Sequence, residues 1–368
     1  MANIVYALAG YGRGHSSRAL ACAAILRAEG HRMTFCCGGP AKIRLEALGE
    51  HVIDVPALKP AIHGNRGDLL KTVVRNAKAF GLGPDFVRLV SQLEAAKPQL
   101  LLADFEPFAP AAADMLGLPV VTLNHQQIVT ETRYPVPPRY RLSALATGAA
   151  IRALCPYRTH HSLISSFYFP PLKRPRQATL LGPLLRQEVL ALKPKRGEHF
   201  LVYFNGGSGL EGLVERLANV DASFTVYNVN APQQTPANVI FKRPSPSFLE
   251  DLAQCRGVIC TAGFNLISEA LFLNKPLLVT PNRGFFEQTL NALYVERDGW
   301  GRASYDDLPS LDMLKTFVAG ATSETPNRNP LIPGNAALAE AINGLLGRLG
   351  KASWPSYSPQ RGTRVRPS

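Results

Sequence analysis

Short uninterrupted apolar runs alternate with segments whose apolar residues recur at helical spacing along most of the chain. Runs of this kind predict strands buried on both faces, and their alternation with helices predicts parallel sheets covered on each side. We therefore expect an α/β protein with two facing doubly wound, Rossmann-like domains. The predicted strands span residues 3–9, 32–37, 100–103 and 120–123 in the first half, and 200–204, 223–229, 239–241, 258–260 and 276–281 in the second.

A proline, a glycine and a charged segment separate the two strand series at Gly182-Pro183. Such a composition is typical of a domain boundary. The apolar spacing after residue 334 predicts a final amphipathic helix, and the basic residues beyond it predict a disordered tail. The expected units are a first domain over residues 1–183, a second domain over 184–334, a helix returning towards the first domain over 335–350, and the tail over 351–368.

The first predicted strand is followed by a glycine-rich turn that ends in His15. Three glycines invite comparison with the dinucleotide-binding pattern G-x-G-x-x-G, but that pattern needs glycine at the position of His15. The second strand also lacks the terminal acid that binds ribose in such proteins. The turn residues Gly12, Arg13 and Gly14 are therefore expected to line a cleft instead.

Polar residues follow the other strands of the first half, where ligands bind in open parallel sheets. Asp104, Glu106, Asn124 and His125 are expected at one rim with His15. An imidazole has an unperturbed pKa of about 6.5, which suits proton abstraction, so His15 is the leading candidate base. Asp104 either orients His15 or is the base itself, and as an alternative it caps the following helix. Residues 56–68 lack periodicity and predict a long loop over the cleft.

The stretch after residue 257 carries the strongest site pattern in the second half. A strand leads through Thr261-Ala262-Gly263 into a helix, whose free N–H groups and dipole suit a diphosphate. Glu269, one to two turns in, could accept hydrogen bonds from ribose hydroxyls. The next crossover brings Glu287, Gln288 and Asn291 to the same side. Residues 205–209 predict a second glycine turn that can bind anionic oxygens.

The segment TAGFNLISEALFLNKPLLVTPNRGFFEQTLNA resembles the donor-binding signature of family 28 glycosyltransferases, and AGYGRGHSSR resembles the glycine-rich loop of the same group. The glycine turn departs from the Gly-Gly-Thr-Gly-Gly-His form of the lipid II enzyme. The resemblance implies the GT-B architecture and a uridine diphosphate sugar as donor. The donor-binding residues that the pattern and the resemblance together assign are Gly206, Gly207, Ser208, Gly209, Arg243, Thr261, Ala262, Gly263, Phe264, Asn265, Glu269, Glu287, Gln288 and Asn291.

The expected reaction is inverting sugar transfer to a hydroxyl acceptor, with a lipid or cell-envelope precursor among the acceptors considered. We expect no cofactor and no metal site, because helix starts and arginines can carry the diphosphate charge and the chain has no Asp-x-Asp. One alternative is a nucleotide-sugar epimerase or hydrolase of the same fold, which donor turnover without acceptor would reveal. Another is a basic nucleic-acid-associated protein.

Composition narrows the cellular setting. With 46% hydrophobic and 18% charged residues, the chain has the composition of a globular protein. The beginning of the sequence enters a strand directly, and six cysteines form no Cys-x-x-Cys pair, so we expect a cytoplasmic protein with reduced thiols. The formal net charge of +13 suggests peripheral contact with an anionic membrane. Nucleic acid is a less favoured partner, because the basic residues are scattered and no recognition motif is present.

Overall fold

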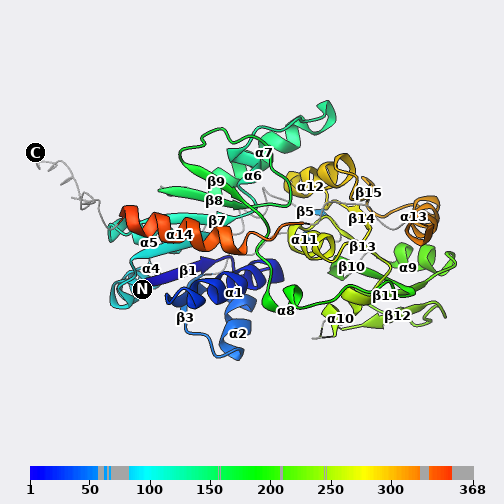
Figure 1. Ribbon diagram of the computed structural model, residues 1–368, viewed down its shortest axis with the longest axis horizontal. Coiled ribbons are helices and arrows are strands. Elements are labelled where there is room, and N and C mark those ends of the chain that lie inside the picture. The colour runs from blue at the N-terminus through cyan, green and yellow to red at the C-terminus, as the bar shows by residue number, and fades with distance from the viewer. Residues whose placement is uncertain are drawn as a thin grey trace, which may run out of the picture.

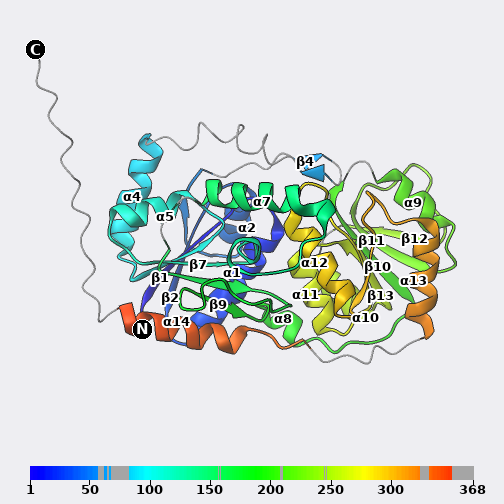
Figure 2. The same ribbon diagram turned by 90° about the horizontal axis from the view of Figure 1, so that it is seen from above.

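Two parallel β-sheets organise the chain, each with helices on both faces (Figures 1 and 2). The computed structural model describes residues 1–56, 62–63, 66–67, 83–155, 157, 159–207, 210–243, 245, 247–323 and 331–349. The helices that matter below are α1 (Arg13–Ala28), α2 (Gly39–Ala47), α4 (Pro84–Ala96), α5 (Phe108–Met115), α6 (Ile128–Glu131), α7 (Arg141–Leu154), α9 (Glu211–Ala218), α11 (Phe264–Phe272), α12 (Phe286–Arg297), α13 (Leu311–Ser323) and α14 (Asn335–Leu349).

The first sheet has the order β3-β2-β1-β6-β7-β8-β9, and all its neighbouring strands run parallel. Alternate residues of β1 enter different cores: Tyr6 packs on the side of α1 and α14, whereas Val5 and Ala7 pack with α4 and α5. Its strands are β1 (Asn3–Leu8), β2 (Arg32–Cys37), β3 (Val52–Asp54), β6 (Leu100–Asp104), β7 (Val120–Asn124), β8 (His161–Ser165) and β9 (Ala178–Leu181).

The second sheet repeats this plan with the order β12-β11-β10-β13-β14-β15, again parallel throughout. In both sheets the strand order reverses beside the first strand, and ligands of doubly wound proteins bind at such a switch point. The two-domain α/β fold predicted from the sequence is therefore confirmed. The strands are β10 (His199–Gly207), β11 (Ser223–Val229), β12 (Val239–Lys242), β13 (Gly257–Thr261), β14 (Leu277–Thr280) and β15 (Gly301–Ala303).

The chain passes between the domains twice, and the two passages touch. The Gly334 N–H donates to the Pro183 carbonyl at 2.9 Å, and Asn335 exchanges hydrogen bonds with the Leu185 backbone at 3.0 and 2.8 Å. A Cβ atom on Gly334 would lie 2.8 Å from the Gly182 nitrogen, so only glycine fits this crossing. Beyond it, α14 lies along α1 of the first domain (Figure 1).

Some local expectations differ from the structure. Within the predicted 56–68 loop, β4 (Ile62–His63) and β5 (Arg66–Gly67) form an antiparallel pair, and most of the remainder lies outside the described residues. The predicted turn at residues 205–209 begins later than expected, because β10 continues to Gly207 through a register shift that pairs this glycine with Val229. Ser208, Gly209 and the predicted tail lie outside the described residues.

Candidate active site

The N-terminus of α1 places His15 at the carboxyl end of the first sheet. Gly12 precedes the helix with a φ of 91°, a value that glycine adopts without the steric cost other residues meet. The helix begins one residue later, so His15 lies in its first turn. The His15 side chain is 15% exposed, so part of the imidazole can be reached from solvent.

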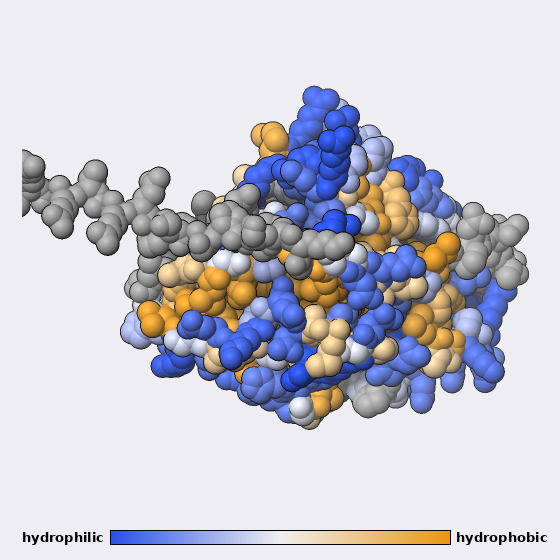
Figure 3. Space-filling view, turned by 60° about the vertical axis from the view of Figure 1, so that its left-hand side comes forward, coloured by the Kyte–Doolittle hydropathy of each residue, from blue (hydrophilic) through white to orange (hydrophobic). Residues whose placement is uncertain are grey.

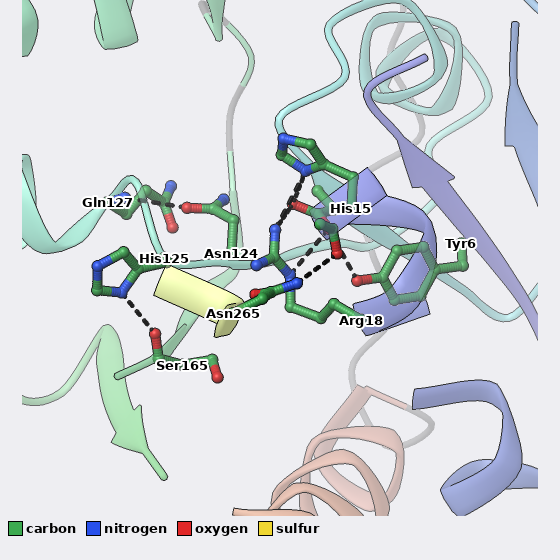
Figure 4. A network of polar contacts seen from close by, with 10 residues as sticks. Tyr6, His15, Arg18, Asn124, His125, Gln127, Ser165 and Asn265 are labelled. Carbon is green, nitrogen blue, oxygen red and sulfur yellow. Dashed lines mark hydrogen bonds and ion pairs between the residues drawn. The ribbon is translucent and has the colours of Figure 1, made fainter. Parts of the chain in front are cut away.

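Asp104, at the end of β6, is the hub of a buried polar network around His15. Figure 4 shows its neighbours Tyr6, His15 and Arg18 pointing towards one another. Asp104 Oδ1 lies 2.9 Å from His15 Nδ1, and its side chain has no exposed surface. Tyr6 donates its hydroxyl to Oδ2 at 3.2 Å. His15 and Asp104, both predicted from the sequence, are thus in direct contact.

Arg18 completes this network and was not among the predicted site residues. It donates to Asp104 twice, from Nε to Oδ2 at 3.0 Å and from Nη2 to Oδ1 at 2.6 Å. Its Nη2 also lies 3.1 Å from His15 Nδ1. Burial alone would raise the pKa of Asp104, but Arg18 and then His15 outweigh it, so the pKa falls below the ordinary value. Asp104 is therefore a carboxylate held by fixed donors.

Glu106 and Asn124 lie near this network but have structural roles. The Glu106 carboxylate accepts the backbone N–H groups of Phe108 and Ala109 at 2.9 and 2.8 Å, which satisfies the start of α5. Glu106, not Asp104, therefore caps that helix. Asn124 Oδ1 accepts the Gln127 N–H in the turn after β7. Both side chains are buried at the carboxyl ends of β6 and β7, and their contact with a ligand stays a prediction.

His125 links the two domains. Its Nδ1 lies 2.8 Å from the Ser165 carbonyl of the first domain, and its Nε2 lies 2.8 Å from Asn291 Oδ1 on α12 of the second. The imidazole stacks on the Phe264 ring at the start of α11, with centroids 4.1 Å apart and an interplanar angle of 11°. His125 is therefore an interdomain contact, placed where the first turn of α11 begins.

Glu287 and Asn291 continue this contact along α12. Asn291 Nδ2 donates to Glu287 Oε1 at 2.8 Å, and Glu287 Oε1 lies 3.5 Å from His125 Nε2. Burial raises the pKa of Glu287 to about 7 and lowers the pKa of His125 to about 4, although both His125 nitrogens face acceptors, as in an imidazolium. Burial therefore favours the neutral form of each side chain.

The start of α11 faces the start of α1. Asn265 Nδ2 donates to the Gly14 carbonyl at 2.7 Å, and Gly263 precedes the helix in an extended conformation (Figure 4). A Cβ atom on Gly263 would meet nothing within 4 Å. The first N–H groups of a helix have no partner within it, so this end of α11 can bind an anion beside His15. Thr261 and Ala262 form the buried strand end behind it.

Glu269 lies in a small cavity between the domains, lined also by Ser17, Arg18 and Asn265. Its carboxylate accepts a 2.7 Å hydrogen bond from Arg186 Nη2. The Arg186 Nε is buried and has no hydrogen-bond partner among the described residues. A buried guanidinium nitrogen without a partner is costly, so the cavity suits a polar or anionic ligand.

The remaining predicted donor residues are less informative. Gln288 Oε1 accepts the Asn282 N–H at 2.8 Å, so this side chain stabilises the loop before α12. Arg243 is exposed at the end of β12. Gly206 and Gly207 belong to β10, and the side chain of Arg13 lies outside the described structure.

The geometry brings a base and an anion site together across the cleft. His15 can accept a proton at Nε2 while Nδ1 faces Asp104, and α11 can bind a departing anion on the opposite side. The arrangement is suited to displacement of an anionic group by a deprotonated nucleophile. The two starting points, α1 and α11, are joined by the contact between Gly14 and Asn265.

Comparison with known proteins assigns the chain to a family. Residues 2–321 match the model of the family described as glycosyl transferase family 1. An uncharacterized glycosyltransferase of Methanosarcina mazei is 24% identical over 336 residues, which cover 84% of this chain and 87% of the relative. One from Methanosarcina acetivorans is 25% identical over 337 residues, with the same coverage.

Solved structures share the fold. The calicheamicin glycosyltransferase CalG4 superposes with a TM-score of 0.64 at 17% identity, covering 95% of this chain and 99% of that one. A Medicago truncatula protein solved with UDP-glucose gives 0.61 at 14% identity, covering 95% and 98%. Acinetobacter baumannii MurG gives 0.56 at 15% identity, covering 93% and 100%.

Proposed function

The chain belongs to glycosyl transferase family 1 and is a glycosyltransferase of GT-B architecture, and from this premise we propose that it transfers a sugar from a uridine diphosphate sugar to a hydroxyl acceptor with inversion. The observation that carries the proposal is the contact between His15 and Asp104 opposite the start of α11. This pair supplies a base on one side of the cleft, and the helix supplies an anion site on the other.

His15 is the proposed general base. With a proton on Nδ1 directed at Asp104, the Nε2 lone pair faces the cleft and can take the proton of the acceptor hydroxyl. The acceptor oxygen then bonds to the anomeric carbon as the bond from that carbon to the diphosphate oxygen breaks. Uridine diphosphate leaves with the bonding electrons, and the configuration at carbon is inverted.

Asp104 is the proposed orienting residue and not the base. Its pKa is lowered despite its burial, and its oxygens already accept hydrogen bonds from Tyr6 and Arg18 as well as facing His15. A carboxylate in this state is a poor proton acceptor and has no exposed surface for a substrate to reach. It can instead fix the imidazole tautomer and stabilise the imidazolium that forms.

The start of α11 is the proposed diphosphate site, and Glu269 the proposed ribose partner. Arg186 pairs with Glu269 and has a further buried Nε that an anionic ligand could satisfy. The uridine nucleotide is inferred from the resemblance of the Thr261–Ala292 segment to family 28 donor sites. The Medicago truncatula structure solved with UDP-glucose supports this choice by analogy.

We propose that Glu287 and Asn291 face the transferred sugar. Both side chains lie beside His125, at the contact between the two domains. The acceptor class that we favour is a lipid or cell-envelope precursor, reached from the cytoplasm at the surface of an anionic membrane. Among the described residues, no helix is both long and apolar enough to cross a bilayer. We propose that no metal is needed, since helix dipole and guanidinium groups suit the diphosphate.

The decisive experiment is kinetic. His15→Ala should lower turnover about 10²- to 10⁴-fold, the range for a positioned base, and abolish the acidic limb of the pH–rate profile. Uridine diphosphate affinity should change little, because its proposed contacts lie mainly in the second domain. His51→Ala, at an exposed histidine of the first domain, is the matched control and should behave as wild type.

Near-normal turnover of His15→Ala with an unchanged acidic limb would reject the assignment of the base. Assays in the presence of EDTA should match those without it, and loss of activity that manganese or magnesium restores would reject metal independence. Donor consumption that proceeds equally without an acceptor would favour a hydrolase or epimerase over a transferase.

A further inference from the structure

The helix α7 has a second apolar face that no described residue covers. Its inner face carries Thr147, Ile151 and Leu154, which are buried against the protein. Its outer face carries Leu142 and Leu145, with 82% and 71% of their surface exposed. The solvent face of a surface helix is normally polar, so this arrangement calls for an apolar environment outside the protein.

The outer face of α7 remains apolar beyond Leu145. Ala146 and Ala149 are exposed one turn apart, and no charged residue occurs between Arg141 and Arg152. Leu142, Leu145 or Ala146, and Ala149 follow the spacing of a single helix face. An exposed stripe of this length is therefore continuous and is flanked by arginine at both ends.

The chain around α7 is strongly and exclusively basic. No aspartate or glutamate occurs from residue 132 to residue 187. That segment supplies nine of the basic residues that produce the net charge of +13, and they are Arg133, Arg139, Arg141, Arg152, Arg158, Lys173, Arg174, Arg176 and Arg186.

The fold brings several of these charges together beside α7. A β-bridge joins Thr132 to Leu172, and Lys173 Nζ donates to the Thr130 carbonyl at 2.8 Å. Partial burial lowers the pKa of Lys173, and the nearby Arg152 and Arg133 lower it further. Arg174 pairs with Glu131 at 2.8 Å, and the other basic residues of α7, of the segment before it and of the β8–β9 loop form one positive surface.

The position of α7 connects this surface to the cleft. The helix packs on α12, and its Thr147 hydroxyl accepts the Phe286 N–H at 3.2 Å, one residue before Glu287. Figure 1 shows α7 at the edge of the first domain, extending beyond the sheet towards α12. In Figure 3 a largely polar projection rises from the molecule with apolar side chains on its flank.

We propose that the outer face of α7, with the basic residues beside it, docks on an anionic lipid bilayer. Leucines that enter the headgroup region between arginines combine apolar burial with attraction to anionic lipid, which is how amphipathic helices bind membrane surfaces. A nucleic acid would use the charges but would leave the leucines in water. A second copy of the chain would face the same positive charge and be repelled.

This proposal deepens the proposed function, because docking there would hold the cleft near a lipid acceptor. It can nevertheless be measured without sugar transfer. The full-length protein is mixed with vesicles of neutral phosphatidylcholine, or with vesicles that also contain about 30 mol% of the anionic lipid phosphatidylglycerol. The anionic lipid gives the second set of vesicles a negative surface potential. Sedimentation then gives the partition coefficient of each variant, and calorimetry gives uridine diphosphate affinity separately.

Wild type should bind the anionic vesicles and not the neutral ones. The Leu142→Ser/Leu145→Ser double variant should bind at least tenfold more weakly, since each leucine contributes apolar burial. Arg141→Gln/Arg152→Gln should lose about fivefold per arginine, the effect of one basic residue near such a surface. Ile43→Ser, at a residue 70% exposed on α2, is the apolar control and should bind as wild type.

Two results would overturn the proposal. The first is failure of the wild-type protein to bind anionic vesicles. The second is undiminished binding by the leucine double variant, which would mean that basic residues elsewhere, such as those of the tail, bind the membrane. If the double variant instead abolished self-association seen by light scattering, the face would be a contact between copies. In each case, normal uridine diphosphate binding would leave the proposed function intact. Failure of the wild-type protein to bind uridine diphosphate would instead reject the proposed function and leave the membrane proposal standing.

Discussion

Arg18 makes the electrostatics of the base depend on three side chains rather than two. Its guanidinium compensates the buried charge of Asp104 and also lies beside His15. In Arg18→Met, Asp104 would depend on a protonated His15 for compensation, so the inactive protonated enzyme is favoured. We expect the acidic limb of the pH–rate profile to move to higher pH, because a positive charge beside the imidazole has been removed.

Glu287 also responds to Arg18: burial raises its pKa to about 7, and the charge of Arg18 opposes that rise. Tyr6 and Cys22 are neutral near pH 7, because burial raises the pKa of each. Arg18→Lys should recover part of the shift. Arg27→Gln, on the same helix but in an exposed pair with Glu50, should leave the limb in place. A fall in turnover at every pH with no movement of the limb would show that Arg18 only supports the fold.

Glu269 offers a test of the donor site that is independent of the base. If it binds the ribose, Glu269→Ala should weaken uridine diphosphate binding by about 1–3 kcal/mol, the range for charge-assisted hydrogen bonds. Calorimetry measures this directly, with Glu215→Ala on the exposed face of α9 as control. Unchanged affinity would mean that the pair of Glu269 with Arg186 is a structural contact between the linker and α11.

Among single residues, the sequence predicted site residues that follow strands, such as His15 and Asp104. It did not predict Arg18, which lies one helical turn after His15 in α1. His15 follows β1 in the first turn of α1, and Asp104 ends the neighbouring strand β6, so their meeting follows from the parallel sheet. Arg18 lies in a helix, where an arginine is usually solvated, and only the packing of α1 on β6 directs it inward. The capping role of Glu106 could not be predicted either, because a carboxylate two residues after a strand can line the end of the sheet or cap the next helix.

Glu106 shows how one element can make stability depend on pH. Burial raises the pKa of Glu106 from 4.5 to about 7, although two N–H donors of α5 oppose this. The folded state then holds the proton more tightly than the unfolded state. Its stabilising contribution is therefore complete below pH 4.5 and is lost as the pH rises through 7.

Glu106→Gln should lack that part of the pH dependence. Its melting temperature relative to wild type should rise by a few degrees between pH 5 and pH 8, as thermal unfolding in matched buffers would show. Glu94→Gln, at an exposed site on α4, should keep the wild-type profile. An identical slope for Glu106→Gln and wild type would show that Glu106 is ionised throughout this range.

Elements with apolar runs were predictable, and those stabilised by polar contacts were not. The strands at residues 100–103 and 258–260 are wholly apolar and appear as β6 and β13. By contrast, β8 contains the polar residues His161, Ser162 and Ser165. The side chains of His161 and Ser165 find their partners, Thr179 and the Gly182 carbonyl, only in the folded protein. No local pattern in that strand separates it from a loop.

For the whole molecule, the crossing of the two interdomain segments should be a point of low tolerance. Gly334→Ala would place a Cβ against the Gly182 backbone, which cannot move without shifting β9 or α14. We expect a loss of about 2–4 kcal/mol in the free energy of unfolding, measured by chemical denaturation. Gly347→Ala, also on α14 but with nothing within 4 Å of the added carbon, should be neutral or slightly stabilising. Equal stability of the two variants would contradict this account.

The same crossing gives the chain the topology of an insertion. The Pro183 carbonyl and the Gly334 N–H are 2.9 Å apart, so the donor-side half leaves and re-enters its host at a single point. A peptide of one or two residues could close that point without displacing any strand of the first sheet. We therefore expect the half that contains the second sheet to be replaceable as one unit at these two positions, while α14 continues to complete the host domain.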